Sequence, residues 1–271
     1  MNLQMQWILD LQNALSTPGM DAFFKFFANY IDTGLTYAVA ILLIWYLLDR
    51  KIGIRLGYLF LCSLAMTILL KYWIDLPRPC QLDTDVKILC LRSPGFPSAS
   101  AQIAAMIFGL ALIECKRNLY RWLALGFALL VSFSRVYLGV HYFTDILGGW
   151  AVGALLVLAY AKFFPLFDKK WKIPALAFPF VFLILGWIFP HASKHTVDLF
   201  FAVLGLGIGL IVADKVGRTA IKKRQLPSVF AGLVGLFVAY LFFPGLLILW
   251  ALLAGFWISF LGAYLVRVRK R

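Results

Sequence analysis

Charged residues are scarce in this sequence. Only 14% of its 271 residues are charged, whereas 63% are hydrophobic, and the mean hydropathy is +0.88. A soluble domain of this size needs more polar surface than this composition supplies. The composition therefore excludes a soluble globular class and indicates an integral membrane protein.

The alternation of polar and apolar residues that marks the strands of a membrane barrel is also absent. Apolar runs close to the ~20 residues of a spanning helix recur instead. We therefore predict an all-α, polytopic helical bundle with about nine transmembrane helices. The predicted spans are residues 33–49, 56–73, 98–115, 119–139, 143–164, 173–190, 197–213, 227–243 and 246–266.

The first 32 residues lack the basic start and the small-residue cleavage site of a signal peptide. Their apolar residues have the spacing of amphipathic helices, interrupted at "TPG" (17–19). We predict that residues 1–32 form an interfacial amphipathic segment on the bilayer surface. Every polar residue with a chemical pattern falls within 33–164, so we predict a catalytic core at 33–166 and a four-helix membrane extension at 167–271.

Acidic residues number only 12 against 26 lysines and arginines, which gives a net charge of +14. Their distribution argues against a nucleic-acid partner, because the basic residues cluster in alternate connections between the predicted spans. The clusters are Arg50, Lys51 and Arg55; Lys116, Arg117 and Arg121; Lys162, Lys169, Lys170 and Lys172; Lys215, Arg218, Lys222, Lys223 and Arg224; and Arg267, Arg269, Lys270 and Arg271. The positive-inside rule then predicts an outer N-terminus and a cytoplasmic C-terminus. We expect the membrane to be a bacterial inner membrane, whose outer face is the periplasm.

Cysteine and histidine are rare, with four and three residues. Cys80 and Cys90 fall in one outer connection with nine residues between them. In an oxidising compartment they suit a disulfide, and two free thiols are the alternative. No metal-ligand cluster is present, so neither a metal nor a cofactor is expected.

The span count brings four helix ends to the outer membrane face. Together they carry a set of polar residues that topology alone does not explain. The set is Lys71, Arg78, Ser98, Ser100, Ser134, Arg135, His141 and Asp145.

These residue types suit phosphate chemistry. The cations Lys71, Arg78 and Arg135 can hold the non-bridging oxygens of a phosphate. His141 is a candidate nucleophile, and Asp145 is placed to fix its tautomer. The segment Ser98, Ala99 and Ser100 opens a helix whose hydroxyl and backbone N–H groups would add neutral donors.

The same residues resemble the type 2 phosphatidic acid phosphatase superfamily of membrane lipid-phosphate phosphatases. Its pattern Lys-x6-Arg-Pro is matched from Lys71 to Arg78, and Ser-Arg-x5-His-x3-Asp is matched from Ser134 to Asp145. The resemblance covers about residues 33–164, and the further spans look like those of the extended members. It implies that His141 becomes phosphorylated with support from Asp145, and that a membrane lipid phosphate is the substrate.

The middle motif of the family, Pro-Ser-Gly-His, is incomplete here. Ala99 replaces its glycine and Ser100 replaces its histidine, which in the family protonates the leaving oxygen. General acid catalysis is worth about 10²–10⁴ in rate. A lipid alcohol is about as weak an acid as water and needs that proton, whereas a lipid monophosphate with a pKa of about 6 leaves without it. We therefore expect a preference for lipid diphosphates such as prenyl diphosphates, with transfer to water or to a second lipid.

Three alternatives stay open at this point. His191 or His195, in another outer connection, would serve as a displaced acid. A pseudo-enzyme would bind or translocate lipid phosphates without turning them over. A serine introduced to silence an enzyme would also explain Ser100.

Overall fold

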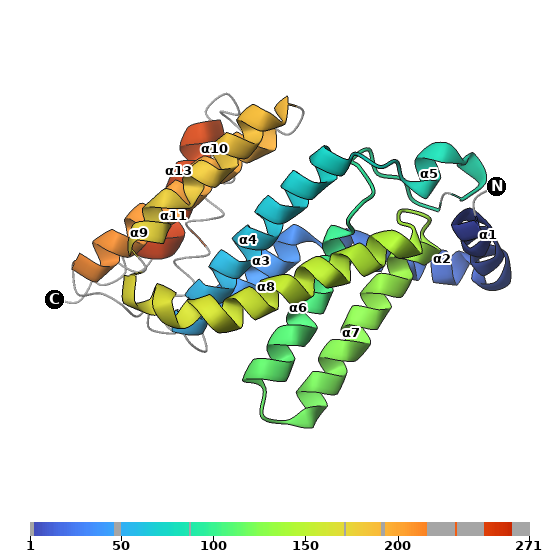
Figure 1. Ribbon diagram of the computed structural model, residues 1–271, viewed down its shortest axis with the longest axis horizontal. Coiled ribbons are helices and arrows are strands. Elements are labelled where there is room, and N and C mark those ends of the chain that lie inside the picture. Colours follow the sequence, from blue (N-terminus) through green and yellow to red (C-terminus); the bar gives the residue numbers. More distant parts are fainter. Residues whose placement is uncertain are drawn as a thin grey trace. The chain divides into compact units, whose positions relative to one another are not determined.

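Helices make up every regular element that the structure describes (Figure 1). The computed structural model describes residues 3–45, 50–86, 88–170, 172–190, 193–215, 231 and 247–261. These contain no strand, in agreement with the predicted all-α class. Most of the predicted span at 227–243 and the ends of those at 33–49 and 246–266 lie outside the described residues.

The chain divides into two compact units, of which the first comprises Met1–Ile41 and Arg55–Phe164. Its N-terminal part contains three short helices and α3. They are α1 (Leu3–Leu15), α2 (Pro18–Phe26), η1 (Phe27–Ile31) and α3 (Gly34–Leu43). Gln12 fastens α1 to the rest of this unit, because its Nε2 donates to Val86 O at 2.8 Å and to Tyr137 O at 2.7 Å.

The longer helices of this unit position the polar cluster. Their bounds are α4 (Arg50–Ile74), α5 (Pro79–Leu82), η3 (Thr84–Val86), α6 (Ala99–Glu114), α7 (Asn118–Tyr137) and α8 (Phe143–Lys170). Figure 1 shows α6 and α7 as a hairpin joined by a short turn. The N-terminus of α6 and the C-terminus of α7 therefore lie at the same end of that hairpin.

Helices α6 and α8 approach closely because glycines face the α6 backbone. A Cβ at Gly149 would come to 3.0 Å from Gln102 N and still closer to Ser98 O. A Cβ at Gly153 would likewise collide with Gln102 O. The small residues let the start of α8 lie directly against the start of α6, where Ser98 N donates to Asp145 O at 3.0 Å.

The second unit comprises Leu42–Ile54 and Pro165–Arg271. Its described helices beyond residue 170 are α9 (Lys172–Ala177), α10 (Pro179–Ile188), α11 (Ser193–Lys215), α13 (Leu247–Phe256) and η7 (Trp257–Leu261). Helices α11 and α13 pack through Gly205 and Gly255, where an added Cβ would meet backbone of the facing helix.

Four helices of the described residues are long and apolar enough to cross a membrane. They are Ile52–Leu82, Asn118–Tyr137, Phe143–Phe163 and Thr196–Lys215. The segments Pro18–Ile31 and Gly34–Leu43, bent by 54° at their junction, would form a fifth span if counted together. Two shorter apolar helices, Ala99–Glu114 and Ala175–Ile188, fall below that length. The chain is thus an integral membrane protein by the length and composition of its helices.

Candidate active site

Lys71 lies in the last turn of α4 and is buried. It continues a polar row formed by Ser63 and Thr67, which contact Gln102 of α6 through bonds of 2.8 and 3.4 Å. The Lys71 ammonium donates to Pro94 O at 2.6 Å and to Gly95 O at 3.2 Å. Carbonyl groups of the segment before α6 therefore hold the cation at the end of the row.

Arg78 precedes α5 and is only 2% exposed. All three guanidinium nitrogens have partners. Nε donates to Ser93 O at 2.6 Å and Nη2 donates to Ser93 Oγ at 2.9 Å. Nη1 donates to Val140 O at 2.8 Å and lies 2.9 Å from His141 Nε2. Arg78 thus joins the segment before α6 to the turn between α7 and α8.

A disulfide links α5 to the segment before α6. Cys80 and Cys90 are bonded, with their Cα atoms 5.6 Å apart. Cys80 lies two residues after Arg78, and Cys90 lies three residues before Ser93. The covalent link therefore keeps the acceptors of Arg78 close to that arginine.

The middle motif forms the start of α6. Ser98 is fully buried at the N-cap, where its Oγ accepts from Ala101 N at 3.5 Å. Ala99 and Ser100 occupy the first turn and are partly buried. The positive end of the α6 dipole and its first N–H groups are suited to an anion.

His141 and Asp145 are both buried, at 4% and 2% exposure. Asp145 lies in the first turn of α8, and its Oδ2 is 3.3 Å from His141 Nδ1. Because Arg78 donates to Nε2, these contacts require the tautomer whose proton is on Nδ1 and points to the carboxylate. The unprotonated Nε2 is then the nucleophilic atom.

The surroundings of His141 keep its ring neutral. Burial lowers the pKa of His141 well below its ordinary value of 6.5, and the positive charges of Arg78, Lys71 and Arg135 lower it further. A hydrogen bond to the Gly95 backbone acts in the opposite direction. A neutral imidazole at neutral pH is the form that attacks phosphorus.

The position of His141 depends on how α7 ends. Gly139 adopts a positive φ of 71°, and a Cβ there would overlap Val86 O. This left-handed residue follows the last turn of α7, where Gly139 N donates to Val136 O at 3.0 Å. The chain then turns back, so that His141 lies beside Arg78 instead of continuing along the helix axis.

Arg135 has a partner that the sequence did not reveal. In the last turn of α7, its Nε donates to Asp32 Oδ2 at 2.8 Å and its Nη2 donates to the same oxygen. Asp32 lies between η1 and α3, outside all three motifs. A lone aspartate after an aromatic helix gave no sign of this role in the sequence.

The remaining candidates fall elsewhere. Ser134 does not face this cluster through its hydroxyl, which donates to Val131 O at 2.7 Å within α7. His191 lies outside the described residues, and the structure describes only the backbone of His195, in α11. In the described part of the chain, no three His, Cys, Asp or Glu side chains are grouped to hold a metal.

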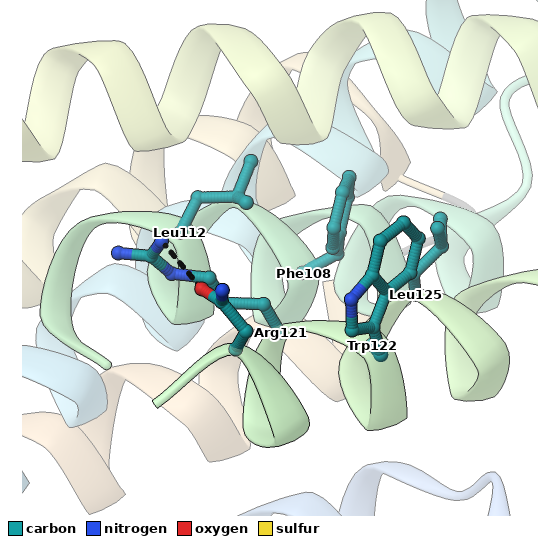
Figure 2. A pocket seen from close by; sticks show the side chains of 6 residues that line it. Phe108, Leu112, Arg121, Trp122 and Leu125 are labelled. Atoms are coloured by element: carbon teal, nitrogen blue, oxygen red, sulfur yellow. Dashed lines mark hydrogen bonds between the residues drawn. The ribbon is translucent and has the colours of Figure 1, made fainter. Parts of the chain in front are cut away.

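A separate cavity of about 370 Å³ lies near the opposite end of the α6–α7 hairpin (Figure 2). Its lining is apolar apart from Asn118 and Arg121, whose side chains bond each other at 3.2 Å. The polar cluster, in contrast, gathers where α6 begins and α7 ends. The two features are therefore at different ends of the same helices.

Comparison with known proteins indicates a family for the segment that carries the polar cluster. The sequence model of the PAP2 superfamily matches residues 51–169, which include all three motifs. Residues 51–169, which are less than half of the chain, are thus similar to the PAP2 superfamily. This match confirms the resemblance to the type 2 phosphatidic acid phosphatase superfamily that the motifs indicate.

Two curated relatives match the PAP2 segment. An undecaprenyl-diphosphatase of Sulfolobus acidocaldarius is 28% identical over 131 residues, which are 48% of this chain and 63% of the relative. A phosphatidylglycerophosphatase B of Bacillus subtilis is 32% identical over 130 residues, which are 44% of this chain and 60% of the relative. The match thus spans less than two thirds of either relative.

A solved structure shares the fold of part of this chain. The crystal structure of Aquifex aeolicus LpxE superimposes with a TM-score of 0.52 at 24% identity, over 60% of this chain and 96% of that chain. At this identity the likeness concerns the fold alone.

Proposed function

We propose that this protein is a lipid phosphate or diphosphate phosphatase that acts through a phosphohistidine at His141. The observation that carries the proposal is the contact geometry of the imidazole. Its Nδ1 lies 3.3 Å from the Asp145 carboxylate and its Nε2 lies 2.9 Å from Arg78. The names of the two curated relatives, a diphosphatase and a phosphatase, support the same class.

In the proposed first step, Nε2 of His141 attacks phosphorus and a P–N bond forms. The bond from phosphorus to the leaving oxygen breaks, and its electron pair departs with that oxygen. Arg78 exchanges its bond to Nε2 for one to a phosphate oxygen, while Asp145 stabilises the positive ring through Nδ1. Water then attacks the phosphohistidine, the P–N electron pair returns to Nε2, and the proton of water passes to solvent.

The phosphate-binding groups of this proposal are Lys71, Arg78, Arg135 and the start of α6 from Ser98 to Ser100. The fixed cations would stabilise the charge that develops on the transferring phosphoryl group. Two of them bond to backbone carbonyls, Lys71 to those of Pro94 and Gly95 and Arg78 to those of Ser93 and Val140. An incoming phosphate would replace these acceptors.

The proposed substrate preference is for diphosphates, because Ser100 supplies no acid for the leaving group. Loss of general acid catalysis costs about 10²–10⁴ in rate where an alkoxide must leave. A lipid monophosphate leaves readily near neutral pH because its pKa is about 6. A prenyl diphosphate-like lipid fits this requirement.

A substrate panel tests the proposal. Phosphate release is measured from a prenyl diphosphate and from a phosphatidic acid, with His141→Ala as the blank. We expect the diphosphate to be turned over at least about 100-fold faster. Equal rates on both lipids would refute the leaving-group explanation while leaving the phosphatase class intact.

A displaced acid is the main alternative for monoester cleavage. His191 and His195 are the only other histidines of the sequence. Replacement of both with Gln should leave turnover unchanged if Ser100 leaves the site without an acid. A selective loss of monoester hydrolysis would assign the acid to one of them.

A phosphotransferase shares every step up to the phosphohistidine. It would differ in the acceptor, which would be a second lipid instead of water. Supplying a lipid alcohol or lipid monophosphate acceptor and analysing the products separates the two reactions.

A pseudo-enzyme that binds or translocates lipid phosphates is the second function class. It would use the same cations, but His141 would never carry a phosphoryl group. Trapping phosphorus on residue 141 after rapid mixing with a lipid diphosphate would exclude this class.

The proposed arrangement in the membrane has nine spans, with residues 1–32 at the interface and the catalytic core at 33–166. The extension at 167–271 would add four further spans. The alternate basic connections support an outer active site and a cytoplasmic C-terminus in a bacterial inner membrane.

A further inference from the structure

Asp32 contributes a buried carboxylate to the site from outside the PAP2 segment. Its side chain accepts from Arg135 Nε at 2.8 Å and from Nη2, and its carbonyl accepts from Nη2 at 3.2 Å. The family match begins at residue 51. Similarity to the PAP2 superfamily therefore assigns no role to Asp32.

The carboxylate is itself held in place on its other side. Tyr37 OH, from the first turn of α3, donates to Asp32 Oδ1 at 2.5 Å. The Tyr37 ring packs with Phe60 of α4 and Ile103 of α6 in a buried cluster. Both carboxylate oxygens therefore have partners, and the ion pair is tied to the helices that carry the phosphate-binding groups.

This pairing leaves Arg135 unlike Arg78. All three guanidinium nitrogens of Arg78 are bonded to the protein, whereas the bonds of Arg135 within the described ranges use Nε and Nη2. Nη1 of Arg135 has no partner among those residues. A guanidinium that is bonded through Nε and Nη2 cannot rotate freely. It presents its remaining nitrogen, Nη1, in a defined orientation.

We propose that Asp32 is a positioning residue that orients Arg135 for the phosphoryl transition state, so that the N-terminal segment is part of the active site. This inference rests on the proposed function. A donor that is oriented before the reaction needs no reorganisation when charge develops on the phosphoryl oxygens. Asp32 also compensates the charge of Arg135 in a cluster that holds two further cations, Lys71 and Arg78.

The first experiment is the steady-state kinetics of Asp32→Asn with the preferred lipid substrate. We expect kcat to fall about 10- to 100-fold, because misplacement of a binding group by about 1 Å has an effect of this size. The KM should change much less, since Lys71 and Arg78 still bind phosphate. A kcat within about twofold of wild type would overturn the inference.

Asp21→Asn is the matched control. Asp21 is also an acidic residue of the N-terminal segment that contacts α7, through Tyr137 OH. Asp21 does not contact Arg135, so the kcat of the Asp21→Asn variant should stay at the wild-type value. A loss equal to that of Asp32→Asn would attribute the effect to docking of the segment and overturn the inference.

A double-mutant cycle tests whether Asp32 acts through Arg135. In an Arg135→Gln background, Asp32→Asn should cause almost no further loss of kcat, because the group that it positions is gone. An equal loss in both backgrounds would overturn the inference.

Binding of orthovanadate separates this inference from the proposed function. Vanadate should raise the unfolding temperature of the wild type more than that of Asp32→Asn. If the wild type releases no lipid phosphate but this difference is found, the positioning role stands and the proposed function fails. If His141→Ala abolishes turnover and Asp32→Asn keeps it in full, the proposed function stands and the inference fails.

Tyr37→Phe decides the question if Asp32→Asn does not fold. It deletes only the bond to Asp32 Oδ1 and leaves the ion pair. We expect kcat to fall about three- to tenfold, as for the loss of one buried hydrogen bond. A wild-type kcat in this variant would then overturn the inference.

Discussion

The imidazole of His141 is neutral because charging it would bring a fourth cation into a buried cluster. Burial and the charges of Arg78, Lys71 and Arg135 lower its pKa. In the unfolded chain the same side chain titrates near 6.5. The difference links the protonation of this residue to the stability of the fold.

A pH dependence of stability follows with a definite sign. Between the lowered folded pKa and pH 6.5, the unfolded chain binds a proton that the folded protein does not. The contribution of His141 to the free energy of unfolding is therefore fully present above pH 6.5. It falls as the pH decreases, by at most about 1.4 kcal/mol per pH unit. Thermal unfolding in detergent from pH 7.5 to 5 should show a smaller decrease for His141→Gln than for wild type. An equal decrease would show that other groups cause the effect.

Ser100 leads to a gain-of-function prediction. The double variant Ala99→Gly, Ser100→His restores the Gly-His pair of the resembled family in the first turn of α6. We expect hydrolysis of a phosphatidic acid to rise by about 10²-fold or more, whereas hydrolysis of a prenyl diphosphate should rise much less. Phosphate release measures both, with Ala99→Gly alone as the control. A rise by the same factor for both lipids would contradict the leaving-group explanation.

The segment between α5 and α6 organises the cations through backbone groups. Residues 93–95 supply acceptors to both Lys71 and Arg78. This segment has no helix from residue 88 to residue 98, and the Cys80–Cys90 bond ties it to α5. Its order therefore depends on a covalent link and on the cations that it binds.

Removal of this disulfide should weaken phosphate binding. In Cys80→Ser, Cys90→Ser we expect KM to rise several-fold, because the acceptors that hold Arg78 are no longer tied to it. The unfolding free energy should fall by about 2–3 kcal/mol for a loop of this length. Kinetics and thermal unfolding measure the two effects, and a reductant should reproduce them in wild type. Ala variants of the free thiols Cys62 and Cys115 are the controls; similar KM changes in them would contradict the prediction.

The first compact unit has two chemically different ends. The phosphate-binding cluster lies where α6 begins and α7 ends, while Lys116 and Arg117 are exposed at the turn that joins the two helices. With 16 residues, α6 is about 24 Å long. The cations of the turn and those of the site are thus separated by most of the apolar thickness of a bilayer.

Orientation in the membrane can be tested at these two ends. In a background without Cys62 and Cys115, Asp83→Cys should react with a membrane-impermeant maleimide in intact cells. Lys116→Cys should react only after the cells are permeabilised, because basic turns stay on the cytoplasmic side. The reverse pattern would show that the site faces the cytoplasm.

Much of the protein could be predicted from local properties of the sequence. Apolar runs identify membrane helices because hydrophobicity acts over ~20 consecutive residues. The spacing from Lys71 to Arg78 and from Ser134 to Asp145 identifies the PAP2 superfamily because those residues share short stretches of chain. A count of nine spans stays a prediction, because four helices of the described residues have the length and composition to span.

Contacts between distant segments were decided only by the tertiary structure. Asp32 and Arg135 are separated by 103 positions, and no pattern in either stretch pairs them. The same holds for Ser93, whose carbonyl and hydroxyl complete the contacts of Arg78. Spacing within a motif predicts which side chains share a helix end. The partner of a buried charge, in contrast, depends on which other segment the packing of the helices brings to it.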